Sequence, residues 1–497
     1  MESIKKHIRQ HKELLIVIAL ALIVRLIGIN HGYPYVLNID EPTIVRTTLG
    51  LNFSLIVDHF DWPHFSYYFN YIFYFLFIKL RGLIQILGLR SYIEPTLPIL
   101  WSDPFVFYLI SRIISAVLGA LTIIPLYLLQ KRLKFEKRSL IIGALFFAFV
   151  PYHVYISHIA IQDSANLFWV MWAVYYLHKA VFDNKLKDYL WSGIFLGISV
   201  GIKYNALLLV GLLPLFILET NSPKNIFEKM KKHFWPSSLL ALTMILTFFA
   251  TTWSLFPKWN IFWSHEYGKG ILWQINSNVS SVHINEYGGN LIRNFADFSG
   301  DFGYAGMVLI LWGVGLLLFN LKPRKIRKIP KGLISSLIIL VFYFLYTSSL
   351  SRSPSHYFLL IYGLVSMLAS YAIDFAYLKK RFIYSLAVFF VLIIMIGQSI
   401  YINYKFINKD TRTIAFGYYE LTRNAGYSYR TYYNGEKLGI TNGLNNMDIK
   451  KFRDVDELRI QDIVISIENF KINGLNLIET IDNKGRFGPV LYIFMKS

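Results

Sequence analysis

The sequence contains no cysteine, which excludes disulfide bonds, thiolate metal sites and cysteine nucleophiles. Acidic residues are also scarce: 30 Asp and Glu stand against 50 Lys and Arg, so the formal net charge is +20. The sequence further lacks a P-loop, a Rossmann-type glycine-rich turn, an HExxH motif and a GxSxG motif. A membrane enzyme without a nucleotide site would need a donor that is delivered in the lipid itself.

Long apolar runs dominate what is present. Hydrophobic residues make up 55% of the 497 residues, and the mean hydropathy is +0.44. Runs long enough to cross ~30 Å of hydrocarbon recur from residue 13 to residue 404. The first run follows a basic N-terminal segment and has no small-residue cleavage site, so we expect a retained first helix rather than a signal peptide. The composition therefore predicts an integral membrane protein.

The positive charge gathers in short loops between the apolar runs, which argues against a nucleic-acid partner. These loops are Lys131–Arg138, Lys179–Lys187, Lys224–Lys232, Lys322–Lys331 and Lys379–Arg381. The positive-inside rule places them in the cytoplasm together with the N-terminus. About 11 transmembrane helices result, at residues 13–30, 104–130, 139–156, 163–182, 189–203, 204–219, 236–254, 304–321, 332–348, 356–376 and 381–404.

One further apolar stretch, residues 66–88, would invert this topology if it crossed the membrane. Its aromatic residues suit the interface, so we predict a helix that lies at the outer surface of the bilayer. Two long outer loops then span residues 31–103 and 255–303. Residues 405–497 are polar, with β-type runs at Asp462–Ile467 and Val490–Phe494, and predict a small soluble extracytoplasmic α/β domain after a membrane domain of residues 1–404.

The adjacent pair Asp40-Glu41, just beyond the first apolar helix, is the leading candidate for chemistry. Two carboxylates at a membrane face are costly to desolvate unless a function uses them. We expect Asp40 to act as a general base, with Glu41 orienting it or an acceptor. The pair also fits a helix start, with Pro42 in the first turn, and the two interpretations are compatible.

Three other segments place charged groups on the predicted outer face. His158 and Asp163 lie in a tight turn, where Asp163 can approach Asp40 or simply cap the next helix. Lys203, between two short apolar helices, can hold a phosphate or extend to the interface. Arg352, before an apolar helix, has the forked geometry that suits phosphate, or is an ordinary solvated arginine.

The remaining polar candidates on this face are aromatic, imidazole and carboxylate groups. They are His265, Glu266, Tyr267, His356 and Tyr357. A bundle with an outer cavity can bring side chains from such distant segments together.

Taken in order, these segments resemble glycosyltransferases of the GT-C fold that use polyprenyl-phosphate sugars, in the superfamily of protein O-mannosyltransferases and lipid A aminoarabinose transferases. Asp40-Glu41 resembles the acidic pair of that family, and Ser111–Gly119 resembles its helix with Arg and Gly. Residues Ser157–Asp163, Gly201–Asn205 and Arg352 with His356-Tyr357 resemble later elements. The similarity covers about residues 13–376, and departs from the family in having only Pro63 where paired prolines are usual.

The resemblance implies a reaction and its partners. The family transfers a sugar from a polyprenyl- or dolichyl-phosphate to an acceptor protein, lipid or glycan on the outer face, usually with inversion. The resemblance implies Asp40 as the base, Arg352 and Lys203 on the donor phosphate, and Asp163 at the acceptor or a metal. No cofactor is required by the sequence, although a divalent metal is compatible with it. We expect a multi-pass protein of the plasma or inner membrane.

Two other classes of protein fit parts of the pattern. A transporter or flippase of a lipid-linked sugar would also have many helices and charges, but it tends to show inverted halves and midplane sites. A binding or scaffold protein would use residues 405–497 and would not need Asp40. The clustering of polar groups at one face favours the enzyme.

Overall fold

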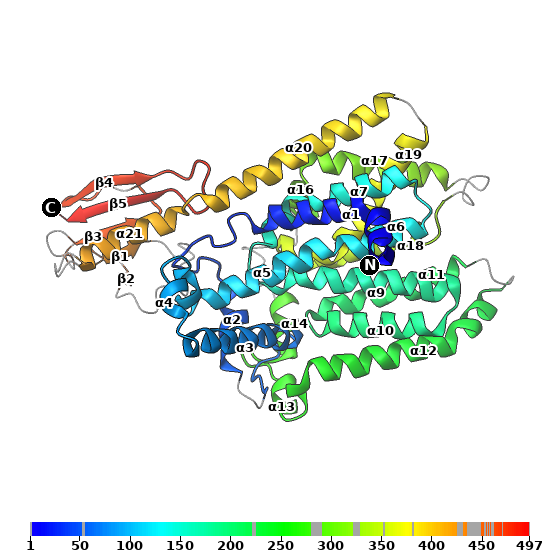
Figure 1. The fold of residues 1–497 in the computed structure, drawn as a ribbon, viewed down its shortest axis with the longest axis horizontal. Helices are drawn as coiled ribbons and strands as arrows, with labels where there is room; N and C mark the ends of the chain where they lie inside the picture. The colour runs from blue at the N-terminus through cyan, green and yellow to red at the C-terminus, as the bar shows by residue number, and fades with distance from the viewer. Residues whose placement is uncertain are drawn as a thin grey trace.

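In a computed structural model, the chain forms a long bundle of helices with a small β-sheet beyond one end (Figure 1). The structure describes residues 2–51, 55–220, 225–279, 291–321, 329–350, 353–379, 382–424, 431–434, 449–451, 454, 456, 458, 462–469 and 471–496. We call the end of the bundle nearest to the sheet the sheet end, and the opposite end the far end. Helix α20 (Phe382–Ile407) runs along the bundle and leads into the sheet domain (Figure 1).

The bundle helices occupy the segments that the apolar runs predict. Besides α20 they are α1 (Glu2–Leu26), α5 (Phe105–Leu121), α6 (Ile123–Arg132), α7 (Lys137–Ala148), α8 (Pro151–Ile156), α9 (Gln162–Asp183), α10 (Leu186–Val200), η2 (Tyr204–Gly211), α11 (Leu212–Leu218), α12 (Ile226–Thr251), α17 (Tyr304–Asn320), α18 (Leu333–Ser349), η6 (Ser355–Ile361) and α19 (Tyr362–Leu378).

Proline divides one predicted span. Residues 139–156 form α7 and α8 rather than one helix, because Pro151 has no amide proton and pushes the preceding residue out of the helical region. Val150 accordingly has φ −63° and ψ 114°.

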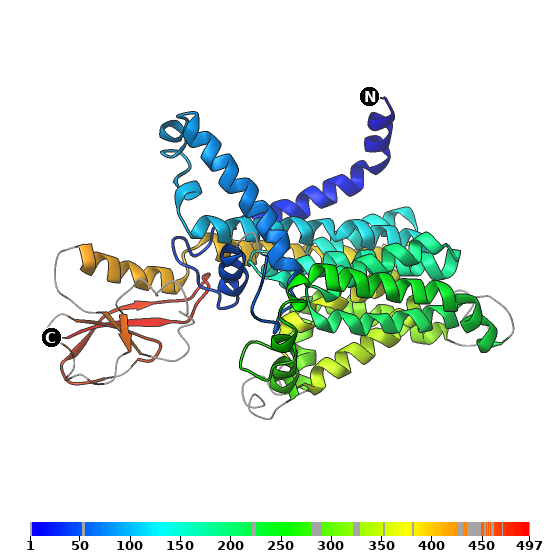
Figure 2. The ribbon, with the colours of Figure 1, turned by 90° about the horizontal axis from the view of Figure 1, so that it is seen from below.

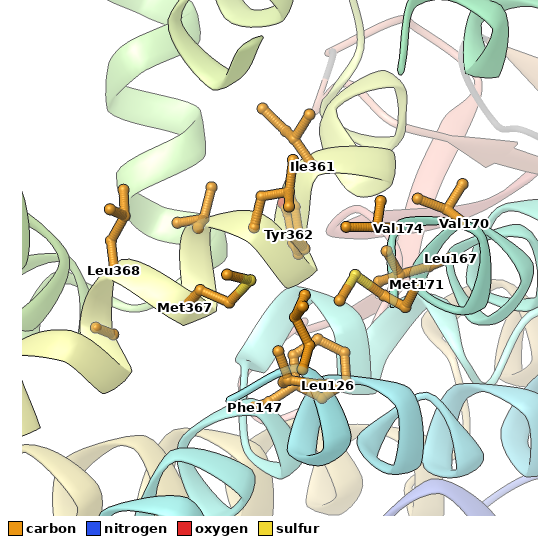
Figure 3. Close-up of a cluster of buried hydrophobic side chains, with 14 of the residues drawn as sticks. Leu126, Phe147, Leu167, Val170, Met171, Val174, Ile361, Tyr362, Met367 and Leu368 are labelled. Atoms are coloured by element: carbon orange, nitrogen blue, oxygen red, sulfur yellow. The ribbon is translucent and has the colours of Figure 1, made fainter. Parts of the chain in front are cut away.

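The core of the bundle is built around α19. Leu126 of α6, Phe147 of α7 and Met171 of α9 meet Tyr362 and Met367 of α19 (Figure 3). In the most apolar part of η6 and α19 (Ser355–Leu378), 89% of the residues are buried inside the protein. In the corresponding part of α12 (Ile226–Thr251), only 6% are buried. An apolar helix that the protein itself leaves uncovered needs another apolar environment, and a membrane supplies it.

Five of the described helices are long and apolar enough to cross a membrane, or six if the bent pair α16–α17 is one span. Broken or short helices such as α7 with α8, and α10 with 15 residues, fall below that length. The number of eleven spans therefore remains a prediction. Helix α3 (Phe65–Ile86) is one of these five, and it leaves the bundle obliquely (Figure 2, blue). Its predicted interfacial position remains a prediction as well.

The connections at the far end contain the basic loops. The turns from α6 to α7, from α9 to α10 and from α11 to α12 all lie there, remote from the sheet (Figure 1). The loop Lys322–Lys331 lies outside the described residues apart from 329–331. Cationic side chains are thus concentrated at one end of the bundle.

Further helices lie in the two predicted long loops at the sheet end. The first loop holds α2 (Glu41–Gly50), α3, α4 (Arg90–Ile93) and η1 (Pro98–Trp101), and the second holds η3 (Trp253–Leu255), α13 (Trp259–Phe262), α14 (Ile271–Val279) and α16 (Leu291–Asp301). Helix α16 meets α17 at a bend of 109°. Gly303 makes this bend with φ +68°, in the left-handed region that favours glycine.

The C-terminal residues form α21 (Thr411–Asn424) and a mixed sheet. Its strands are β1 (Thr431–Asn434), β2 (Ile449–Lys451), β3 (Ile463–Ser466), β4 (Leu475–Ile481) and β5 (Leu491–Lys496), in the order β2-β1-β3-β5-β4. Strand β1 pairs in parallel with β2 and β3, whereas β5 is antiparallel to β3 and β4. The two predicted β-type runs are confirmed as β3 and β5.

Candidate active site

A cavity of about 540 Å³ at the sheet end gathers residues from distant parts of the chain. Asp40 comes from the start of α2, Asp163 from the first turn of α9, and Lys203 from the residue before η2. His356 and Tyr357 belong to η6. The structure thus brings together five of the residues that the sequence predicts for the site.

Asp40 stands at the start of α2 and is partly buried. Its carboxylate makes no capping hydrogen bond to the helix. Asn38 takes that role instead: its side-chain oxygen accepts from the amides of Asp40 at 2.9 Å and Glu41 at 3.3 Å. Asn38 therefore accepts the hydrogen bonds that an N-cap side chain would accept. Asp40 lies at the start of the helix and lines the cavity. The positive end of the helix dipole favours a carboxylate here.

Glu41 does not line the cavity. Its two oxygens accept from Nε and Nη2 of Arg112 at 2.7 and 2.8 Å, and both side chains are fully buried. The amide of Ala160 donates to the same carboxylate at 2.8 Å. Nη1 of Arg112 also donates to the carbonyls of Ile29 at 3.2 Å and His31 at 2.8 Å. Through Arg112 and the amide of Ala160, Glu41 therefore fastens the start of α2 to α5, to the segment after α1 and to the turn before α9.

Asp163 and Lys203 form an ion pair in the cavity wall. Asp163 lies inside the first turn of α9, and the N-cap residue is Ile161, so the carboxylate is not the cap. The ammonium group of Lys203 lies 4.6 Å from the ring centre of Tyr357. Tyr343 donates to the carbonyl of Tyr357 at 3.0 Å and thereby fixes the backbone of η6. Lys203 consequently points into the site and not out to the membrane interface.

His158 lies away from the cavity and is fully buried. Its ring nitrogens lie 2.8 Å from the carbonyl of Val154 and 2.9 Å from that of Ile27. The ring stacks on Phe406 at a centroid distance of 4.2 Å. This position joins α8 to the ends of α1 and α20, which is a structural arrangement.

The candidates of the second loop lie outside the cavity lining. Glu266 pairs with Lys269 at 2.5 Å, and Nδ2 of Asn276 lies 3.1 Å from Nδ1 of His265. Tyr267 is 85% exposed and packs against Trp273, which does line the cavity. Arg352 lies outside the described residues.

Several residues in or behind the cavity wall were given no role in the site by the sequence analysis. They are Thr43, Asp61, Trp62, Pro63, Trp273, Gln274 and Asn278, together with Arg112 behind Glu41. The segment from Asp61 to Pro63 carried a signal, since it combines an acid with a tryptophan and a proline directly before an aromatic helix. Within the part of the chain that the structure describes, no group of three His, Asp or Glu side chains is arranged to hold a metal ion.

The chain is similar to known glycosyltransferases in one segment of sequence and in fold. Residues 109–253 match the sequence profile of the dolichyl-phosphate-mannose-protein mannosyltransferase family. No curated protein matches the chain significantly.

Among solved structures, ArnT from Cupriavidus metallidurans bound to undecaprenyl phosphate has 11% identity and a TM-score of 0.52, over 97% of this chain and 98% of that one. The oligosaccharyltransferase AglB from Archaeoglobus fulgidus, in complex with an inhibitory peptide and a dolichol-phosphate, has 14% identity and a TM-score of 0.50, over 87% of this chain and 63% of that one.

The protein O-mannosyltransferase complex Pmt1-Pmt2 from S. cerevisiae, bound to the sugar donor, has 19% identity and a TM-score of 0.35, over 55% of this chain and 36% of that one. The chain thus spans less than two thirds of the yeast and archaeal proteins. The chain is thus similar to the dolichyl-phosphate-mannose-protein mannosyltransferase family over residues 109–253, and it shares its fold with ArnT along nearly the whole length of both chains.

Proposed function

We propose that the chain transfers a sugar from a polyprenyl- or dolichyl-phosphate to an acceptor hydroxyl on the extracytoplasmic face, with inversion at the anomeric carbon. The lipid phosphates bound to ArnT and AglB support this class of donor. The basic loops at the far end support the sidedness, because positive loops favour the cytoplasm. A donor embedded in the membrane also agrees with a sequence that has no nucleotide-binding motif.

The observation that carries the proposal is that Asp40 and Lys203 line the same cavity. An acceptor hydroxyl needs a base as its oxygen attacks the anomeric carbon, and Asp40 would take that proton. The bond from the anomeric carbon to the phosphate oxygen breaks, and its electron pair leaves with the lipid phosphate. Lys203 would stabilise the added negative charge, and Arg352 is a further candidate for this role.

The other residues of the wall would position the reactants. Asp163 holds the ammonium group of Lys203 through their ion pair, so the cation is oriented before the donor binds. Tyr357 packs under the same ammonium group, and His356 precedes it in η6. No step of this proposal uses a metal.

The decisive experiment is a transfer assay with the purified protein and a panel of polyprenyl-phosphate sugars. Replacing Asp40 by Asn keeps the shape and removes the base, so turnover should fall about 10²–10⁴-fold. The thermal unfolding midpoint should stay the same, because Asn38 and Glu41 make the local contacts.

Asp58→Asn is the matched control. Asp58 lies in the same loop, is 72% exposed and pairs only with Lys258 among the described residues. This variant should transfer sugar at the normal rate. Near-normal transfer by Asp40→Asn would dismiss Asp40 as the base.

A further inference from the structure

A second cavity lies where the membrane bundle meets the C-terminal domain. Its volume is about 310 Å³, and it shares no lining residue with the cavity of Asp40. The loop before α2 contributes Asn38, α8 contributes Tyr155, and the end of α20 contributes Lys405. The C-terminal residues Arg412 and Phe487 close the other side. We call this space the junction cavity.

The junction cavity holds one cation in excess. Both oxygens of Asp410 are engaged by Arg412, at 2.9 Å from Nε and 2.8 Å from Nη2, so this pair is neutral. Lys405 has no ion pair within the described part of the chain. Its ammonium group instead lies 4.7 Å from the ring centre of Phe487. The ring face attracts the ammonium group but carries no net charge, so it does not neutralise the cation.

Asn38 adds a hydrogen-bond donor to the lining of the junction cavity. The side-chain oxygen of Asn38 is occupied by the amides of Asp40 and Glu41, so its NH₂ group remains as a donor. Arg412 also donates to the carbonyl of Leu37 at 3.1 Å, which ties the C-terminal domain to this loop. A ligand that accepts several hydrogen bonds and carries negative charge satisfies Lys405 and Asn38 together, whereas a cation would be repelled.

The position of the cavity narrows the choice of anion. Lys405 lies in the last turn of α20, at the end of a long apolar helix, which corresponds to headgroup depth in a bilayer. Phosphate is the anionic group of that layer, and lysine binds it as a point charge. Asn38 is also two residues before Asp40, so a group bound here would lie beside the loop that carries the proposed base.

We propose that the junction cavity binds a phosphate group of the acceptor, so that the acceptor is a phosphorylated glycan or glycolipid. The acceptor role rests on the proposed function, whereas the phosphate site itself can be measured without any transfer.

The test measures binding by the full-length protein in phosphate-free detergent, without a sugar donor. One arm titrates inorganic phosphate and glucose 6-phosphate by calorimetry. The other arm compares mixed micelles that contain phosphatidic acid with micelles that contain diacylglycerol, with the thermal unfolding midpoint as readout. Binding in the first arm indicates a soluble phosphorylated acceptor, and stabilisation confined to the second arm indicates a lipid-borne phosphate.

Lys405→Gln should weaken phosphate binding at least tenfold in the arm in which the wild type binds. Lys409→Gln is the matched control, because Lys409 is exposed four residues later and does not line the cavity. Lys405→Arg should retain binding, which separates loss of the cation from misfolding. Equal binding by Lys405→Gln and the wild type, or no binding by the wild type to any of these probes, would overturn the proposal.

Asp40→Asn separates this proposal from the catalytic one. That variant should lose transfer yet bind phosphate as the wild type does, because Asp40 does not line the junction cavity. If Lys405→Gln lost phosphate binding but transferred sugar normally, the junction cavity would still be a phosphate site, but it would not bind the acceptor.

Discussion

At the scale of single residues, we expect the ion pair of Glu41 and Arg112 to contribute strongly to the stability of the fold. Both charges are fully buried, and their remaining hydrogen bonds go to three backbone groups, in the segment after α1 and in the turn before α9. Removing one partner leaves the other charge buried and unpaired, which typically costs about 3–5 kcal/mol. Arg112→Ala should therefore lower the thermal unfolding midpoint strongly, and transfer should fall with it because the start of α2 loses its anchor.

Arg90→Ala is the control for this prediction. Arg90 pairs with Glu94 by similar contacts, but the two side chains are 45% and 39% exposed. Solvent screens such a pair, so the unfolding midpoint of this variant should hardly change. Equal midpoints for the two variants would contradict the anchoring role of Arg112.

Lys203 allows a second prediction at this scale. If its ammonium group stabilises the leaving phosphate, Lys203→Ala should reduce kcat by roughly 10²–10³-fold, as removal of one preorganised donor does. Lys258→Ala removes a cation that pairs with Asp58 outside the cavity lining, and should transfer normally. The measurement is kcat from steady-state kinetics at a fixed acceptor concentration. An unchanged kcat for Lys203→Ala would show that Lys203 does not stabilise the leaving phosphate.

Sequence reasoning placed Asp40, Asp163 and Lys203 on one face and gave Asp40 and Glu41 different roles, but it could not identify the partner of Glu41. The two carboxylates are chemically alike and adjacent, and only the fold shows that Arg112, 71 residues away, takes Glu41. The sequence likewise did not show that His158 lies outside the cavity. Its partners are backbone carbonyls of α8 and of the segment after α1, and a sequence does not reveal contacts to carbonyl groups.

At the scale of elements, apolar periods predict where helices lie, but not where packing breaks them. The bend between α16 and α17 depends on Gly303, whose Cβ would lie 2.1 Å from the side-chain oxygen of Gln398. Gly303→Ala thus combines a left-handed backbone with a clash, and should destabilise the protein by about 1–3 kcal/mol.

Gly315→Ala in α17 provides the comparison. Nothing lies within 4 Å of the Cβ that this change would add, and alanine is the better helix former. The unfolding midpoint should fall for Gly303→Ala and stay level or rise for Gly315→Ala. A Gly303→Ala protein as stable as the wild type would show that the bend does not need glycine.

At the scale of the whole molecule, charge and chemistry are separated along the bundle. The basic turns lie at the far end, whereas the cavity of Asp40, the junction cavity and the sheet domain lie at the other. The charge pattern of the sequence predicts this separation, because the positive-inside rule assigns all the basic loops to one side of the membrane. The pattern does not reveal that the C-terminal domain touches the loop before Asp40, since that contact joins Arg412 to Leu37 across 375 residues.

The absence of cysteine permits a direct test of the predicted orientation. Lys484 of the C-terminal domain has a side chain that is 91% exposed, and Lys137 at the far end has one that is 71% exposed. In intact cells, a membrane-impermeant maleimide should label Lys484→Cys and spare Lys137→Cys, while permeabilised cells should show both labelled. The cysteine-free parent gives the background in both cases. Labelling of Lys137→Cys alone in intact cells would invert the topology and place Asp40 on the cytoplasmic side, where an extracytoplasmic transfer is impossible.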